Sequence, residues 1–356
     1  MELLVLDTNF DSVAVLDIFK SLIWTDRYNA YGDFEIYTSM SQELLEILKE
    51  DYYLWLKESD HSMIIESLTI DSDAENGDHL TVKGRSLESI LLRRIVYGQK
   101  NLVGNFQDAI EELLNENFIS PTDENRKIDN FVFERSNDPK ITSLTIDNQY
   151  TGDNVYDIIN KQCETNNIGF KIVLNDSNQF VFSLYAGKDR SYDQLENPYV
   201  VFSPKYENII SSNYFRSKES LKTVTLVAGE GEGVSRKTIE TGSGSGLDRY
   251  ELFTDARDIS SEVYDEEGNE TILSNEEYNK LLVARGTEDL SKYIVKEAFE
   301  GKVETKNLFK YGEDFFIGDI VQNEDDYGHT SRTCISELIF SQSNNDVSVY
   351  PTFKTV

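Results

Sequence analysis

The stretch VAGEGEGVSRKTIETGSGSGLDRY, residues 227–250, contains six glycines, and its interpretation decides the fold. Glycine-rich loops cradle phosphates, connect domains as flexible linkers, or bend a β-sheet. A phosphate loop requires the pattern GxxxxGK[ST] at the start of a helix. Gly229 and Gly231 lack the lysine and hydroxyl residue at that spacing, and the glutamates beside them would repel a phosphate. The sequence therefore predicts no nucleotide site here.

The residues on both sides favour two β elements joined by an acidic turn. TVTLVA precedes GEGEG without a break, and the β-branched segment VSRKTIE follows it. Glycines that continue a strand are typical of a bulge or of two backbones in close contact. GSGSG, residues 242–246, has the composition of a flexible linker and is expected to form the mobile tip.

Composition indicates a folded, acidic chain of two or three domains. It has 356 residues, of which 39% are hydrophobic, and its 20 Tyr and 19 Phe favour strands and packed interfaces. The 34 basic against 65 acidic residues give a net charge of -31, which predicts no specific nucleic-acid binding. The N-terminus lacks the basic start of a signal peptide, and no apolar run reaches the length of about 18 residues that membrane insertion needs.

Residues 1–100 are expected to form a β-rich domain with little helix. Ser39 and Gln42 match a capping box that would open a short helix, and Asn76-Gly77 is a hairpin turn signal. A further helix is predicted to start near Ser86.

Residues 101–196 are expected to form a small inserted α/β domain, because β-rich sequence resumes after them. Asn105 is predicted to cap one helix, and a second is predicted to begin near Gly152. GFKIVL and FVFSLYAG are expected to form a hairpin. Residues 197–356 return to strands, interrupted near 274–299 by a helical insertion with a capping box at Ser274 and Glu277. Gly286 is expected to kink or divide that helix.

The sequence predicts no metal site, no cofactor site and no catalytic residue. His61, His79 and His329 lie far apart, and residues 71–78 lack the glycine and glutamate of a calcium loop. Cys163 and Cys334 are expected to be two buried small hydrophobic residues, although one long-range disulfide stays open. Carboxylate pairs are too abundant to indicate a glycosidase without a cleft.

Several segments together resemble the tail-hub proteins of siphophages and related tails of Gram-positive bacteria, also called baseplate hub or tail-associated proteins. The resemblance covers almost the whole chain, and the segments that carry it include LDIFKSLIWTDRYNAYGDFEIY, LTVKGRSLESILLRRIV, TGDNVYDII, VVFSPKYENIISSNY, LVAGEGEG and SGLDRYELFTDARDISSE.

The resemblance implies an α+β, mainly β fold like the contractile-phage central hub. Two tail-tube-like β-barrel domains, residues 1–100 (completed by strands after 197) and 197–356, would flank the inserted α/β domain at 101–196. Three chains would form a ring that closes the tail tube and adapts its sixfold symmetry to a threefold tip. The implied location is the virion tail tip or baseplate, after assembly in the bacterial cytoplasm. A negatively charged lumen would let DNA slide through the bore.

The implied partners are two further copies of the chain, a distal tail ring protein, the tape-measure protein, and tip fibre or receptor-binding proteins for host attachment. Longer relatives carry C-terminal lytic or fibre regions, and no lytic residue is transferred from them. A siphophage, a contractile phage and a tail-like bacteriocin all stay open. Two alternatives stay open as well: a peptidoglycan hydrolase with a carboxylate pair in 101–196, and a carbohydrate-binding module around YVVFSPKYENIISSNYF.

Overall fold

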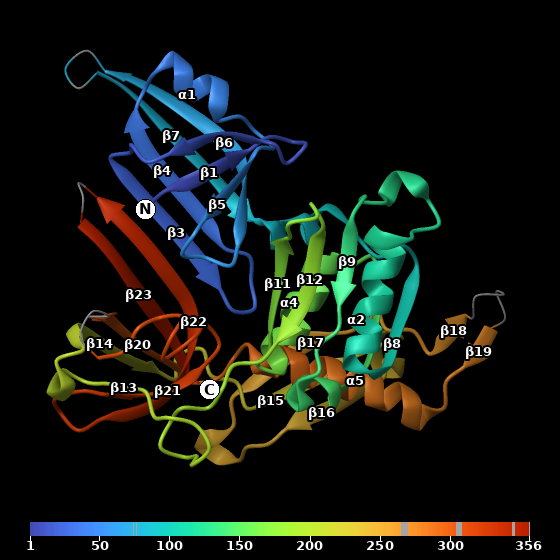
Figure 1. Cartoon of the computed structure of the whole chain (residues 1–356). Helices are drawn as coiled ribbons and strands as arrows, with labels where there is room; N and C mark the ends of the chain where they lie inside the picture. Colours follow the sequence, from blue (N-terminus) through green and yellow to red (C-terminus); the bar gives the residue numbers. More distant parts are fainter. Residues whose placement is uncertain (74, 76, 265–269, 304–307, 344–345, 356) are drawn as a thin grey trace.

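A computed structural model of the chain describes residues 1–73, 75, 77–264, 270–303, 308–343 and 346–355. Strands dominate within these residues and helices are few, as the sequence predicts (Figure 1). The N-terminal and C-terminal strands share one large sheet, in the order β14-β20-β23-β22-β3-β4-β7-β6-β5-β1-β2, with β13 and β21 branching from β22. Its N-terminal strands are β1 (Leu3–Leu6), β2 (Ser12–Leu16), β3 (Ser21–Arg27), β4 (Asp33–Ser39), β5 (Tyr53–Leu56), β6 (Ser62–Asp73) and β7 (Gly77–Ser86). Its C-terminal strands are β13 (Val201–Phe202), β14 (Ile209–Ser217), β20 (Lys296–Val303), β21 (Ile320–Glu324), β22 (Thr330–Ser343) and β23 (Asp346–Thr355).

The large sheet buries one face of most of its strands over a common core. In β4, Phe34, Ile36 and Thr38 are buried while the side chains between them are partly exposed, which is the period of two of a strand with one buried face. The same core contains Trp24 of β3 and Phe340 of β22, which are register partners. Because β22 pairs with β3 on one side and β23 on the other, strands from the two ends of the chain belong to one sheet.

The two closed β-barrels that the sequence analysis expects do not appear in the strand pairing. Among the described residues the sheet is an open path, because β2 pairs only with β1 and β14 pairs only with β20. The physical reason is that a period of two specifies which face of a strand is buried but not which strand lies beside it. The 14-residue β22 is long enough to bridge both halves.

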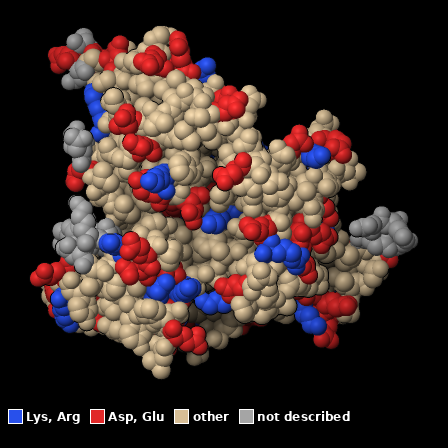
Figure 2. All heavy atoms as spheres, viewed as in Figure 1, with Lys and Arg blue, Asp and Glu red and all other residues tan. Residues whose placement is uncertain are grey.

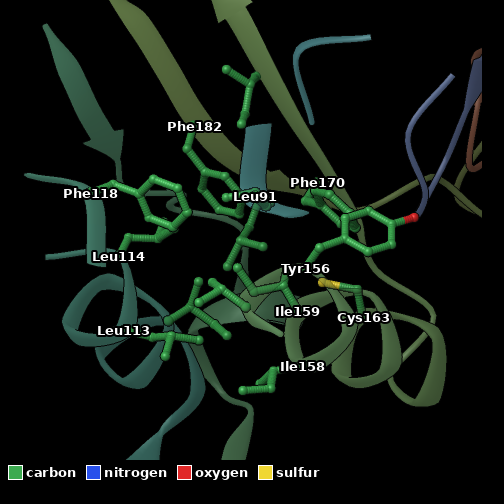
Figure 3. Close-up of a cluster of buried hydrophobic side chains, with 14 of the residues drawn as sticks. Leu91, Leu113, Leu114, Phe118, Tyr156, Ile158, Ile159, Cys163, Phe170 and Phe182 are labelled. Atoms are coloured by element: carbon green, nitrogen blue, oxygen red, sulfur yellow. The ribbon is translucent and has the colours of Figure 1, made fainter. Parts of the chain in front are cut away.

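The middle of the chain packs helices against two small sheets. Its elements are η1 (Leu87–Arg93), β8 (Gln99–Asn105), α2 (Phe106–Leu114), η2 (Asn115–Ile119), η3 (Glu124–Arg126), β9 (Phe131–Glu134), α3 (Pro139–Thr142), β10 (Thr145–Thr151), α4 (Val155–Thr165), β11 (Gly169–Leu174) and β12 (Phe180–Tyr185). Figure 3 shows their shared core, in which Leu113 of α2, Ile159 of α4 and Phe182 of β12 point toward one another. Asn105 caps α2 by accepting from two backbone N–H groups, as predicted, and η1 begins after Ser86 as a 3-10 helix.

A third group of elements surrounds the one long helix. It comprises β15 (Val224–Ala228), η5 (Gly233–Ser235), β16 (Thr238–Gly242), η6 (Gly246–Asp248), β17 (Glu251–Asp255), β18 (Glu262–Tyr264), β19 (Glu270–Ile272) and α5 (Asn275–Ser291), whereas η4 (Pro204–Tyr206) lies beside β14 of the large sheet. The Ser274–Glu277 capping box is present. Helix α5 runs unbroken through Gly286, so the predicted division into two helices is wrong, and Gly286 allows α5 to lie against β15 and β16.

Two further sequence predictions concern the cap of helix α1 and the hairpin of β6 and β7. Helix α1 (Gln42–Ile47) is capped by Ser41 and not by Ser39, because Ser39 is still the last residue of β4. Strands β6 and β7 form the predicted hairpin, and Gly77 has the positive φ of +79° that the turn requires. Asn76 and the central part of the 71–78 segment lie outside the described residues. In the described part of the chain, no helix has the length and apolarity to span a membrane.

Candidate functional site

The glycine-rich stretch is part of the wall that α5 packs against, and it opens no α-helix. Strands β15 and β16 are an antiparallel pair joined across residues 229–237, as predicted, and the intervening helical turn is only η5. A Cβ at Gly229 would lie 2.3 Å from the Tyr278 hydroxyl of α5. That hydroxyl accepts from the Glu230 N–H at 2.8 Å, and the Glu230 carboxylate accepts from Ser261 N at 2.7 Å. The Glu230 N–H is therefore committed to a protein partner and does not face a ligand.

GSGSG does not form the tip of this hairpin. It connects the end of β16 to η6 and then to β17, which runs parallel to β15 on its other side. A Cβ at Gly242, where φ is +94°, would lie 2.3 Å from the Thr223 carbonyl oxygen. Gly242 allows this close backbone approach. GSGSG is therefore a surface connection between β16 and β17 and not the hairpin tip that the sequence predicts.

The histidines and cysteines do not gather into a metal or thiol site. No cluster of metal-ligating side chains occurs among the described residues. His79 stacks on Tyr37, and His329 Nδ1 lies 2.7 Å from Asp325 Oδ2. Cys163 and Cys334 are free and buried, as predicted. Burial raises the pKa of Cys334 to about 12 and that of Cys163 higher still, which removes both as nucleophiles at neutral pH.

The third histidine belongs to a buried polar network that the sequence analysis missed. His61 Nδ1 lies 2.9 Å from Glu88 Oε1, and the Ile172 N–H donates to the same oxygen at 2.8 Å. Ser59 donates its hydroxyl to Asp26 at 2.7 Å. Because these residues come from β3, the β5–β6 connection, η1 and β11, only the tertiary fold brings them together.

The network has the residue types of a hydrolase but not the geometry. A nucleophilic serine must be hydrogen-bonded to its histidine base, whereas Ser59 donates to a carboxylate. Burial disfavours the charged form of His61, but Glu88 and Asp26 outweigh it and raise the pKa of His61 to about 9. A histidine that stays protonated at neutral pH is a poor base. The network instead connects the large sheet to β11 through the contacts of Glu88 with His61 and with the Ile172 N–H.

A cleft of about 780 Å³ beside β8 and α2 contains the carboxylates that a hydrolase in residues 101–196 would use. Glu112 and Glu116 line it, and both carboxylates bind the ammonium of Lys100. Burial works against the charge on Lys100, but the two glutamates prevail and raise its pKa. Both carboxylates are therefore engaged by the same ammonium, whereas the two carboxyl groups of a glycosidase must be free to contact a substrate between them.

The free edge of the large sheet is the most prominent unpaired feature. Strand β2 exposes Val13 and Val15, and Ile18 follows with 78% of its surface exposed. Val15 pairs with Leu4, and Leu4 pairs with Trp55, which is 40% exposed, so an apolar row crosses three strands. The signal was present in VAVLDIF, because a strand with apolar residues at consecutive positions has two apolar faces.

A second exposed group consists of tyrosines from the segment before β14. Tyr192 and Tyr199 make an edge-to-face contact with ring centroids 5.5 Å apart, and each is more than 40% exposed. Tyr206 is exposed as well, whereas Phe202 from the same segment is in the core. Acidic and basic side chains are interspersed over the face drawn in Figure 2.

Comparison with known proteins gives a family for the whole chain. The model of the family described as Siphovirus ReqiPepy6 Gp37-like protein matches residues 2–353. No curated protein matches the chain.

Solved structures of tail proteins share the fold over nearly the full length. Prophage tail protein gp18 from Listeria monocytogenes EGD-e is 15% identical with a TM-score of 0.56, covering 99% of this chain and 94% of that chain. The 43 kDa tail protein of prophage MuSo2 from Shewanella oneidensis is 10% identical with a TM-score of 0.61, covering 100% and 98%. The tail protein from Neisseria meningitidis MC58 is 12% identical with a TM-score of 0.59, covering 99% and 96%.

Proposed function

The chain belongs to the Siphovirus ReqiPepy6 Gp37-like family of phage tail proteins, and from this we propose that it is the homotrimeric hub at the distal tip of the tail. In this role it is a structural part of the virion and has no catalytic step. Three chains close the tail tube and adapt its sixfold symmetry to a threefold tip. The single observation that carries the proposed ring contact is the open sheet, whose edge strands β2 and β14 have no second strand partner among the described residues.

Contact between copies would use the two ends of that sheet. Isolated proteins normally protect an edge strand with charge, proline or a covering loop, but β2 carries exposed Val13 and Val15. At the other end, β14 exposes Phe215. A contact between two different surfaces of identical chains repeats head to tail and closes into a ring when the rotation permits. On this proposal the barrel-like halves, residues 1–100 and 197–356, are completed in the ring, with 101–196 as the inserted domain.

The remaining parts of the role follow from the same position in the tail. The partners are the distal tail ring protein, the tape-measure protein and tip fibre or receptor-binding proteins. The chain has 65 acidic and 34 basic residues, and this negative net charge supports a bore that repels DNA and lets it slide. Assembly takes place in the bacterial cytoplasm before the virion is released.

The test replaces one edge valine with lysine. Val15→Lys places a charge in the apolar row and is expected to abolish self-association, while leaving circular dichroism unchanged because the side chain is 60% exposed. Val234→Lys is the matched control, since Val234 is fully exposed in η5, away from the large sheet. Association of the Val15→Lys protein equal to that of the wild type would contradict the proposed contact.

A carbohydrate-binding role at the tip is the second candidate, favoured by the exposed tyrosines. Tyr192, Tyr199 and Tyr206 offer ring faces on which sugars stack. A glycan array is expected to give hits that Tyr199→Ala removes. An array without hits would leave the structural role alone.

A further inference from the structure

A small cavity lies where three distant segments meet, on the side of His61 that faces away from Glu88. It has a volume of about 230 Å³. The segments are the connection between β5 and β6, the ends of β11 and β12, and the chain before β21. The residues that line it include Asp60, His61, Lys171, Lys188, Tyr311 and Phe316.

Two hydrogen-bonding groups that line this cavity have no protein partner. His61 is 2% exposed, and its Nδ1 is committed to Glu88 at 2.9 Å. Its Nε2 has no hydrogen-bond partner among the described residues, and neither has the hydroxyl of Tyr311. Because Glu88 holds the proton-bearing Nδ1, the protonated ring offers its Nε2–H as a second donor.

The rim adds an excess of positive charge. Lys171 Nζ lies 3.1 Å from Asp60 Oδ2, so the ammonium of Lys171 is ion-paired. The ammonium of Lys188 has no ion-pair partner within the described part of the chain, while its backbone N–H donates to Asp319 at 2.7 Å. Asp319 is itself neutralised by Arg190 at 2.7 Å. The balance of the lining groups is therefore cationic and rich in donors.

We propose that this cavity binds an organic carboxylate. Four donors, on His61, Tyr311, Lys171 and Lys188, suit an acceptor-only group, and they would repel a metal cation. The ring of Phe316 and its neighbours give the cavity an apolar wall, which favours a carboxylate attached to a hydrocarbon body over a bare ion. The volume is below the range of about 300–1,000 Å³ typical of drug-sized ligands, so the bound group is small.

The carboxylate has two sources that present the same chemistry: a free small acid, or the aspartate or glutamate side chain of another polypeptide. Benzoate is the probe for the first, and an acetylated, amidated Gly-Phe-Glu-Gly peptide is the probe for the second. Benzamide has the shape of benzoate without its charge and serves as the control ligand. The proposal does not depend on the tail role, because it concerns the isolated chain.

The readout is NMR of the full chain with labelled histidine. The chain has only three histidines, and His79→Gln and His329→Gln assign the signals by elimination. Benzoate is expected to shift the His61 signal saturably and to leave the other two unchanged, while benzamide shifts none. A response to the peptide that is tighter than the response to benzoate identifies a polypeptide side chain as the occupant, and the reverse order identifies a free acid.

Variants of the rim separate binding from folding. Lys188→Gln is expected to weaken benzoate binding about tenfold, as loss of a charged hydrogen bond does, and Tyr311→Phe severalfold. Lys280→Gln, on exposed α5, is the matched control and is expected to bind as the wild type does. No saturable His61 shift with either probe, an equal shift with benzamide, or unchanged binding by Lys188→Gln would overturn the proposal.

Discussion

Glu88 is fully buried, and its charge is retained because His61 and the Ile172 N–H both contact one of its oxygens. Burial would raise the pKa of Glu88, but His61 reverses the effect and the pKa is lowered. Breaking a buried ion pair by removing one partner typically costs about 3–5 kcal/mol, whereas the pair itself adds little over an apolar contact. The pair therefore fixes where β11 lies against the large sheet more than it adds net stability.

The His61–Glu88 pair predicts a pH dependence of stability. The pKa of His61 is raised from 6.5 to about 9 in the folded chain, so its stabilising contribution is complete below pH 6.5 and is lost as the pH rises through 9. The free energy of unfolding, from denaturant titrations at pH 6 to 9.5, is expected to fall over this window. In His61→Gln that part of the fall should be missing; an identical pH profile in the two proteins would contradict a charged pair.

The two cysteines give a second prediction at this scale. Both thiols are buried and free, and burial raises their pKa values. The native chain is expected to react slowly with a thiol reagent such as Ellman's reagent, and two thiols per chain should react at once in denaturant. Rapid labelling of the native chain would show that Cys163 or Cys334 is accessible.

At the scale of the element, α5 depends on the absence of a side chain at Gly286. A Cβ there would lie 2.5 Å from the Cγ2 atoms of Thr241 and Val227. Gly286→Ala would gain up to about 1 kcal/mol of helix propensity in an exposed helix, but here the clash is expected to cost about 1–3 kcal/mol. Thermal unfolding should show a lower midpoint, with Asn279→Ala on the exposed face as the control. A midpoint raised by Gly286→Ala would mean that α5 does not pack this closely.

The sequence predicted elements best where local chemistry specifies them. Asn105 and Ser274 were assigned correctly as caps, because capping depends on neighbours two or three residues away. Ser39 was assigned wrongly, since its side-chain type fits a cap equally well but the strand continues through it. The composition of GSGSG predicts a hairpin tip, whereas its place between β16 and β17 depends on strand pairings that the sequence does not specify.

At the scale of the molecule, the sequence does not predict which strands pair with one another. The alternation in β4 predicted its buried face, but nothing local assigns β22 to β3 across more than 300 residues. The same limit applies to the sites. His61, Glu88 and Asp26 carry no motif, and the cavity at Lys188 exists only after three distant segments meet.

The open edge of the large sheet favours association of the molecule with another chain. A chain of this length buries a sufficient core alone, so the exposed apolar row at Val15, Leu4 and Trp55 is not a consequence of small size. Edge strands of this kind are templates for pairing with another chain. If three copies meet through these edges, the apolar row becomes interior, and the solubility of the free chain depends on its charge of -31.

The proposed ring is tested by the mass and symmetry of the purified chain, from mass photometry and electron microscopy over a range of concentrations. We expect a particle of three 40.8 kDa chains, with threefold symmetry and a central opening, whose population rises with concentration. A ring with a different number of chains, or a monomer at every concentration used, would contradict it.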